Sequence, residues 1–146
     1  MINKNCKGAV PTPGLMKVDD SALLVPAREL VDKMRAHIEV QAIHLALTAL
    51  WDLVGQANRY VDSQAPWALR KTDPERMATV LYVLAEVIRH LAILAQPVVP
   101  DAAGKMLDQL AIPQNQRDFS NLGEVYMLEP ATPLPKPQGV FPRYSG

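Results

Sequence analysis

The residues best suited to chemistry lie in segment 58–71, whose sequence is Asn-Arg-Tyr-Val-Asp-Ser-Gln-Ala-Pro-Trp-Ala-Leu-Arg-Lys. Near its end Pro66 precedes Trp67, and two cations, Arg70 and Lys71, follow. A flat aromatic ring beside cations suits single-stranded nucleic acid, because a base stacks on the ring while the cations hold its phosphates. The pattern therefore indicates a nucleic-acid contact at Trp67.

Trp67 also fits a purely structural interpretation. A single tryptophan beside a helix junction is usually packed between helices, and composition and position alone favour that interpretation. The preference for packing over a nucleic-acid contact is reduced by three neighbours, Pro66, Arg70 and Lys71. The second tryptophan, Trp51, has no such neighbours, and we expect it to be an ordinary core residue.

Other reactive side chains give no second candidate site. The sequence has no Walker loop, dinucleotide-binding fingerprint, nucleophile elbow or paired-cysteine zinc motif. His37 and His44 are seven residues apart and would share a helix face, but nothing nearby completes a metal site. His90 is isolated, and the adjacent Asp19 and Asp20 suit a helix start better than acid–base chemistry. We expect no catalytic, cofactor-binding or metal-binding residues in this chain.

Composition predicts one helical domain. Of 146 residues, 49% are hydrophobic but only 5% are aromatic, so the core must consist of Leu, Ala, Val, Ile and Met. These side chains favour helices over strands. The 15 basic and 15 acidic residues cancel, which counts against strong independent affinity for RNA without excluding a local contact.

No targeting segment or membrane span is expected. Residues 1–14 contain neither an apolar core nor an arginine-rich amphipathic leader. The longest hydrophobic stretch, 77–95, is interrupted by polar side chains and predicts a buried helix. The single cysteine, Cys6, excludes an intrachain disulfide and suits a reducing compartment. We expect a soluble, cytoplasmic protein.

Apolar spacing and proline positions predict an all-α helical bundle with helices near residues 26–35, 37–63, 73–96 and 100–110. In the second helix, apolar residues recur every three or four positions at Ile38, Ala42, Leu45, Ala46, Ala49, Leu53, Ala57, Tyr60 and Val61. Pro66 ends this helix, because it forces the preceding Ala65 out of helical geometry. Asp73 is the expected N-cap of the third helix.

The third helix is apolar enough to be central to the bundle. We expect its inward face to contain Met77, Leu81, Leu84, Ile88, Leu91 and Ala95, and its thin polar edge to contain Glu86, Arg89 and His90.

Beyond residue 112 frequent prolines exclude a long helix. Residues 125–128 predict one short strand. Residues 133–137 predict an extended, partly polyproline II tail that needs another surface to order it.

Four segments in order resemble the anticodon-binding domain of methionyl-tRNA synthetases. The first is Asn5-Cys6-x-Gly8-x-Val10-Pro11-x-Pro13-Gly14, and the second is 58–71 with its Asn-x-Tyr-x-Asp…Pro-Trp pattern. The third is 91–100 with its two closing prolines, and the fourth is the Val-Phe-Pro-Arg run at 140–143. The resemblance covers nearly the whole chain.

The resemblance implies a helical anticodon-binding bundle at residues 1–112, lacking its first helix, followed by an irregular Pro-rich tail at 113–146. Its implied function is anticodon recognition within an ATP-dependent methionine–tRNA ligase, with initiator and elongator methionine tRNA as partners. Trp67 would stack on or border an anticodon base, with Pro66 setting its angle. Arg70 and Lys71 would meet backbone phosphates.

The chain also departs from the family. It lacks the His-Ile-Gly-His-type and Lys-Met-Ser-Lys-Ser-type motifs of the catalytic domain, where ATP and methionine bind. The family's upstream Asn and Arg that contact anticodon bases are absent as well, and Asn58 and Arg59 are not their counterparts. Because the catalytic motifs are absent, we expect the chain alone to be inactive as a ligase. Because the first helix of the bundle is absent, we expect an exposed groove through which the chain self-associates. The alternatives are a helical protein–protein interaction module or an inactive fragment.

Overall fold

Long helices form the body of the protein. The computed structural model of the chain describes residues 1–141. The helices of 22 residues each are α2 (Val18–Glu39), α3 (Ile43–Gln64) and α5 (Pro74–Ala95). Shorter elements are α1 (Ile2–Asn5), α4 (Pro66–Thr72) and α6 (Pro100–Gln109), with 3-10 turns at Gln114–Gln116, Phe119–Leu122 and Glu124–Tyr126. The predicted all-α class is confirmed.

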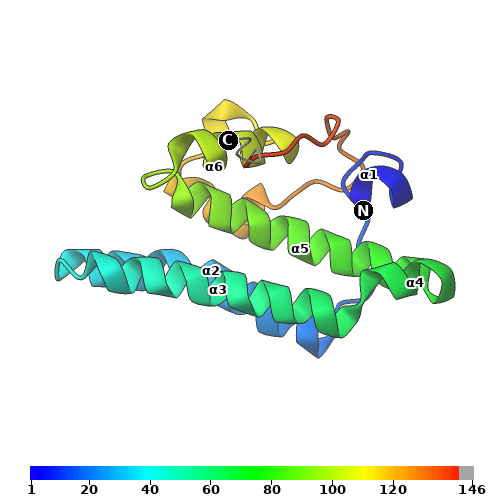
Figure 1. Ribbon diagram of the computed structural model, residues 1–146, viewed down its shortest axis with the longest axis horizontal. Helices are drawn as coiled ribbons and strands as arrows, with labels where there is room; N and C mark the ends of the chain where they lie inside the picture. Colours follow the sequence, from blue (N-terminus) through cyan, green and yellow to red (C-terminus); the bar gives the residue numbers. More distant parts are fainter. Residues whose placement is uncertain (142–146) are drawn as a thin grey trace, which may run out of the picture.

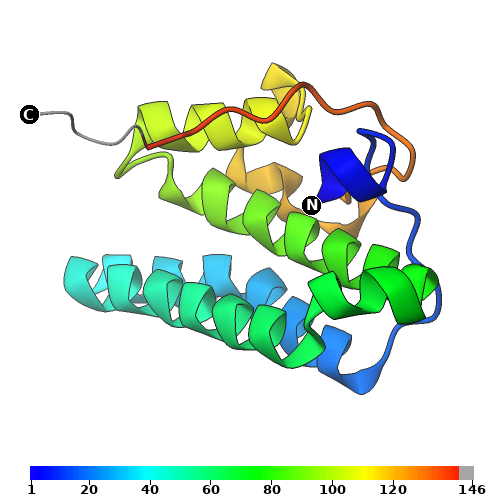
Figure 2. The same cartoon turned by 45° about the vertical axis from the view of Figure 1, so that its right-hand side comes forward.

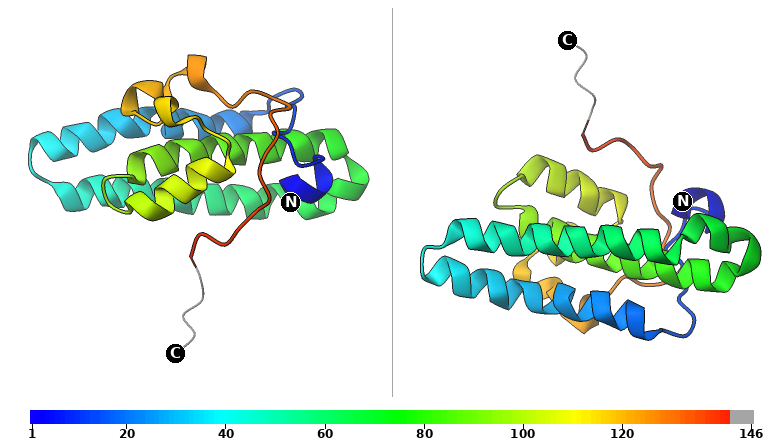
Figure 3. Two further views of the ribbon diagram at one scale, coloured as in Figure 1. Left: turned by 90° about the horizontal axis from the view of Figure 1, so that it is seen from above. Right: turned by 60° about the horizontal axis from the view of Figure 1, so that its bottom comes forward.

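The arrangement places α5 at the centre. The antiparallel pair α2 and α3 packs against one side of α5, and α6 packs against the other (Figure 1). Helix α4 lies at the end of the molecule where the chain passes from α3 into α5. The tail leaves the side of α1 and runs back along α6, where the side-chain amide of Gln109 donates to the carbonyl of Gln138 (Figures 2 and 3).

The first long helix begins eight residues earlier than the predicted Pro26. Its start is Val18, because the carboxylate of Asp20 accepts a hydrogen bond from the backbone N–H of Lys17 and so caps the first turn. Pro26 lies inside α2 instead. The acidic pair that sequence placed upstream of the helix thus forms its first turn.

The predicted helix 37–63 is wrong at its beginning. Residues 37–39 belong to the end of α2, and the chain reverses at Gln41, whose φ of 59° no helix accommodates. His37 and His44 consequently lie on different helices rather than on one face. Within residues 1–141, no cluster of three or more His, Cys, Asp or Glu could hold a metal ion.

Helix α5 is the core helix, but its faces differ from the prediction. It is long and apolar enough to span a membrane, yet 78% of that stretch is buried inside the protein, as in the core of a globular domain. The predicted polar edge of Glu86, Arg89 and His90 is buried, whereas Ile88, predicted to face inward, is exposed. The charges tolerate burial because Arg89 pairs with Glu86 at 2.6 Å.

The same buried ions hold the C-terminal segment against α5. Arg89 donates to the carbonyl of Asn121 at 2.7 Å, and Glu86 accepts from the backbone N–H of Leu128 at 3.1 Å. The strand predicted at 125–128 is wrong: the chain forms a 3-10 turn at Glu124–Tyr126 and makes one isolated bridge between Ala9 and Pro133. Of the predicted 140–143 run, the last two residues lie outside the described part.

Candidate nucleic-acid interface

The corner between α3 and α4 positions the candidate interface. Ala65 has φ 42° and ψ 60°, a left-handed conformation that ends α3. The following proline predicts the end of the helix at this residue, but it favours extended and not left-handed backbone. The carbonyl of Ala65 accepts the backbone N–H of Ala68 at 2.8 Å and so opens the next helix. The chain does not merely turn here: Pro66 begins the seven-residue helix α4, which sequence did not predict.

Pro66 and Trp67 point in different directions from this corner. Pro66 is fully buried, whereas the Trp67 side chain is 54% exposed. The packed interpretation of Trp67 is therefore wrong, because an interhelical core residue would lie inside. The ring is available to a ligand while its neighbour anchors the backbone.

The two predicted cations lie on the same helix as Trp67. Arg70 and Lys71 occupy the last turn of α4, and both are exposed. Residues three and four positions apart share a helix face, so the two cations lie beside Trp67. The structure thus brings all four predicted site residues onto α4 and gives it an exposed aromatic and cationic face.

A buried polar cluster lies at the base of this corner, formed by Asp20, Tyr60, Gln64 and Arg76. Arg76 donates to both oxygens of Asp20 at 2.6 and 2.8 Å and to the side-chain oxygen of Gln64 at 2.5 Å. The hydroxyl of Tyr60 donates to Asp20 as well. The cluster joins α2 to the end of α3 and the start of α5, the two helices that flank α4 in the sequence.

The cluster keeps its charges. Burial alone would raise the pKa of Asp20, but hydrogen bonds from Arg76, from the backbone of Lys17 and from Tyr60 outweigh it and lower that pKa below its usual value. The hydrogen bond to Asp20 raises the pKa of Arg76. Burial, followed by the contact with Asp20, raises the pKa of Tyr60. The cluster is therefore an ionised salt bridge with a neutral tyrosine.

Sequence reasoning missed this cluster. The sequence indicates a helix start at Asp20, and it places Tyr60 in the apolar stripe and in the family-like Asn-x-Tyr-x-Asp pattern, but it does not indicate that the two residues meet. A usable signal exists: Tyr60 and Gln64 are four residues apart in α3 and present polar atoms on one face of it. Their partners, Asp20 for Tyr60 and Arg76 for Gln64, could not be found in this way, because these two residues are 56 positions apart in the sequence.

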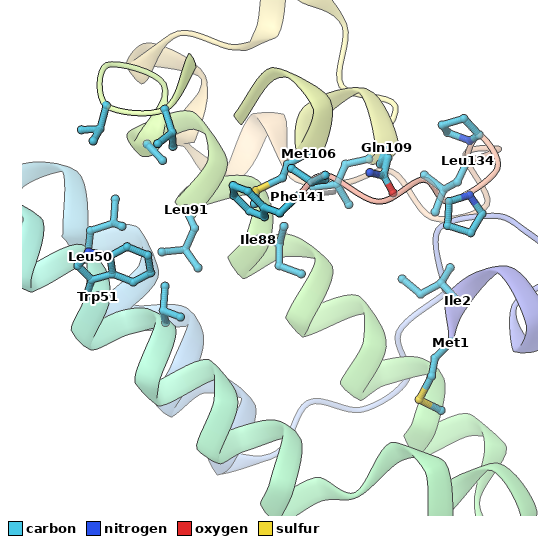
Figure 4. Close-up of a pocket in the computed structure, with 18 of the residues that line it drawn as sticks. Met1, Ile2, Leu50, Trp51, Ile88, Leu91, Met106, Gln109, Leu134 and Phe141 are labelled. Carbon is cyan, nitrogen blue, oxygen red and sulfur yellow. The ribbon is translucent and has the colours of Figure 1, made fainter. Parts of the chain in front are cut away.

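A second surface is an apolar groove of about 780 Å³ bounded by α3, α5, α6 and the tail. Trp51 projects into it from α3, Ile88 and Leu91 from α5, and Met106 from α6, with Phe141 alongside (Figure 4). Trp51 is 66% exposed, so the prediction that it is a core residue is wrong.

Comparisons with known proteins agree with this architecture. A family model described as the anticodon binding domain of methionyl tRNA ligase matches residues 10–145. The chain is 52% identical over 144 residues to the methionine–tRNA ligase of Mesorhizobium japonicum and 49% identical over 148 residues to that of Mycobacterium tuberculosis. Each match covers 99% of this chain but 28% of the relative, so the chain spans little more than a quarter of their length.

Solved structures give the same result. The apo form of Mycobacterium tuberculosis methionyl-tRNA synthetase is 48% identical with a TM-score of 0.94, covering 100% of this chain and 30% of that chain. The same enzyme bound by methionyl-adenylate gives a TM-score of 0.93 at 48% identity, over 97% of this chain and 28% of that chain.

The helical bundle and these similarities define a class: the helical anticodon-binding domains of aminoacyl-tRNA synthetases. Within that class, the chain belongs to the family of anticodon-binding domains of methionyl-tRNA ligases.

Proposed function

We propose that this domain binds the anticodon loop of methionine tRNA as part of a methionine–tRNA ligase. The supporting observation is the shared face of α4, where the exposed ring of Trp67 lies beside Arg70 and Lys71. An anticodon base stacks on Trp67, and buried Pro66 holds the angle of the ring. Arg70 and Lys71 contact the phosphates, where a cation gains affinity by releasing counterions.

The chemistry of the ligase takes place elsewhere in this proposal. ATP and methionine bind in a catalytic domain of the longer protein, and this chain holds neither cofactor nor metal. The relatives are about three and a half times longer, which leaves room for such a domain. The partners are initiator and elongator methionine tRNA, the compartment is the cytoplasm, and no membrane is involved.

The test is binding that depends on the loop and on Trp67. The purified chain and its Trp67→Ala variant are titrated at low salt with a methionine anticodon stem-loop and with the same stem as a blunt duplex that has no loop. Both RNAs offer phosphates to Arg70 and Lys71, but the loop alone offers unpaired bases that stack on the ring. Tighter binding of the stem-loop by the parent, with this preference reduced in Trp67→Ala, is expected. Equal binding of the stem-loop and the duplex by the parent contradicts the proposal.

A second candidate function, self-association, is favoured by the groove. Trp51, Ile88, Val98 and Val99 all expose large apolar side chains along it. Contiguous exposed apolar surface on a soluble protein marks an interaction site. We propose that a second copy of the chain occupies the groove, since two chains of zero net charge do not repel each other.

A further inference from the structure

A hydrogen bond joins the two ends of the segment that carries Trp67. Gln64 is the last residue of α3, and Arg76 lies in the first turn of α5. The guanidinium Nη2 of Arg76 donates to Oε1 of Gln64 at 2.5 Å. This contact closes a loop over residues 65–75, which contains the whole of α4.

The Arg76 end of this contact is rigid. Its guanidinium forms a two-pronged pair with Asp20, and the same carboxylate accepts hydrogen bonds from Tyr60 and from the backbone of Lys17 at 2.8 Å. Arg76 and Asp20 are both buried, so the pair is little screened by solvent. Gln64 therefore bonds to a fixed group rather than to a mobile side chain.

Helix α4 needs such support, because its own anchors are few. A seven-residue helix is marginal in isolation. Pro66 is its one fully buried side chain, with Leu69 partly buried against the core. Ala65, which joins it to α3, has a left-handed conformation that costs energy for a residue other than glycine and persists only where its surroundings hold it.

We propose that Gln64 is a positioning residue for Trp67: its hydrogen bond to Arg76 holds α4 at the angle that presents the ring to an RNA base. The part that concerns RNA rests on the function proposed above. The part that concerns the order of α4 stands on the contacts alone. A misplacement of the ring would weaken stacking even though Gln64 touches no ligand.

The experiment uses the Trp51→Phe chain, in which Trp67 is the single tryptophan. Gln64→Met removes the oxygen acceptor but leaves both bonds between Arg76 and Asp20, so the fold is retained, as circular dichroism melting will verify. The Gln64 amide also donates to Asp19 at 3.1 Å, and Asp19→Ala removes that contact alone. Gln64→Glu restores an oxygen acceptor for Arg76, and it is made in the Asp19→Ala chain, where no neighbouring Asp19 carboxylate opposes the new charge. Gln96→Met is the matched control, because Gln96 donates to the carbonyl of Arg117 at 2.7 Å near the other end of α5.

Two measurements are made on each variant: the time-resolved fluorescence anisotropy of Trp67, and the affinity for the methionine anticodon stem-loop. Gln64→Met is expected to increase the fast component of the anisotropy decay and to weaken RNA binding about fivefold, the fold-change equivalent to one hydrogen bond. Three variants are expected to match the parent in both measurements: Asp19→Ala, Gln64→Glu in the Asp19→Ala chain, and Gln96→Met.

Unchanged anisotropy in Gln64→Met overturns the positioning role. If Gln64→Met increases the motion of Trp67 but binds RNA as tightly as the parent, the order of α4 does not affect RNA binding. This outcome overturns the proposed effect on binding, provided that Trp67→Ala does weaken binding. If Trp67→Ala binds RNA as well as the parent, the proposed function fails, and the anisotropy of Gln64→Met still decides whether Gln64 orders α4.

Discussion

Pro66 and Trp67 are adjacent in sequence but lie in opposite environments, since the proline is fully buried and the tryptophan ring is 54% exposed. The proline fixes the backbone φ at the start of α4 and packs inside, so the ring is held outward without being part of the core. Burial and exposure are therefore divided between neighbouring residues, so substitutions can test the packing of the corner and the proposed RNA contact separately.

Truncating Trp67 should change stability little. We expect Trp67→Ala to alter the free energy of unfolding by less than about 1 kcal/mol, because exposed positions contribute little. Leu53→Ala, at a site that is 2% exposed, should cost about 2–5 kcal/mol. Urea unfolding of both variants measures the difference. A loss of several kcal/mol in Trp67→Ala would show that the ring is a packing residue after all.

Lys71 should act on RNA through its charge. Lys71→Ala is expected to weaken binding of any stem-loop and to reduce the slope of log affinity against log salt by about 0.7, the value for one phosphate contact on a single strand. Lys33→Ala, an exposed lysine of α2, is the control and should leave the slope unchanged. Titrations over a series of salt concentrations measure both slopes. An identical slope in Lys71→Ala and the parent would exclude the phosphate contact.

Asp20 should make stability depend on acid pH. Its pKa in the folded chain lies below the ordinary 3.8, because its hydrogen bonds outweigh burial. As pH falls from about 5, the unfolded chain therefore takes up protons first, and the free energy of unfolding falls. The contribution of Asp20 is complete above that range and is lost as pH falls through the folded pKa.

Replacing Asp20 should remove this dependence at a cost in stability. Asp20→Asn is expected to lower the free energy of unfolding by about 3–5 kcal/mol at neutral pH, since Arg76 remains buried without its counter-ion. Below about pH 5 its free energy of unfolding should fall less steeply with falling pH than that of the parent. Asp32→Asn removes an exposed pair with Arg35 and should change stability by less than about 1 kcal/mol. Denaturant titrations between neutral and acid pH compare the two. If the free energy of unfolding falls equally with pH in the parent and in Asp20→Asn, Asp20 is not the source of the acid sensitivity.

The sequence was sufficient for local features of the fold and site. Asp73 caps α5 by accepting from the backbone of Arg76 at 3.0 Å, as its type and position predict. Pro66 ends α3, as predicted, because it excludes helical geometry at Ala65. These outcomes depend on a few neighbouring residues, which is why one sequence window contains the information.

Contacts between segments far apart in the sequence could not be predicted from a single sequence window. The sequence predicts Glu86 and Arg89 on a thin polar edge of the helix, but they are buried and bind backbone groups 42 and 32 residues away, respectively. The exposure of Trp51 likewise depends on how α6 and the tail lie relative to α3. Such contacts are a property of the packing of distant segments.

The groove should mediate weak self-association. We expect the chain to sediment as a concentration-dependent mixture and to bind a hydrophobic dye, because apolar side chains line the groove. Ile88→Glu places a charge on the groove floor and should give a monomer with less dye binding. Val125→Glu is the control, since Val125 is 91% exposed but lies away from the groove. A parent chain that stays monomeric and dye-silent at all concentrations would contradict this prediction.

The most direct test of the account compares the two exposed tryptophans. The affinity for the methionine anticodon stem-loop is measured for the parent, Trp67→Ala and Trp51→Ala, which remove rings of similar exposure from α4 and from the groove. We predict that Trp67→Ala loses about 1–3 kcal/mol of binding free energy, the usual value of one base–aromatic stack, and that Trp51→Ala loses none. Parental affinity in Trp67→Ala, or an equal loss in both variants, would contradict the assignment of the anticodon contact to α4.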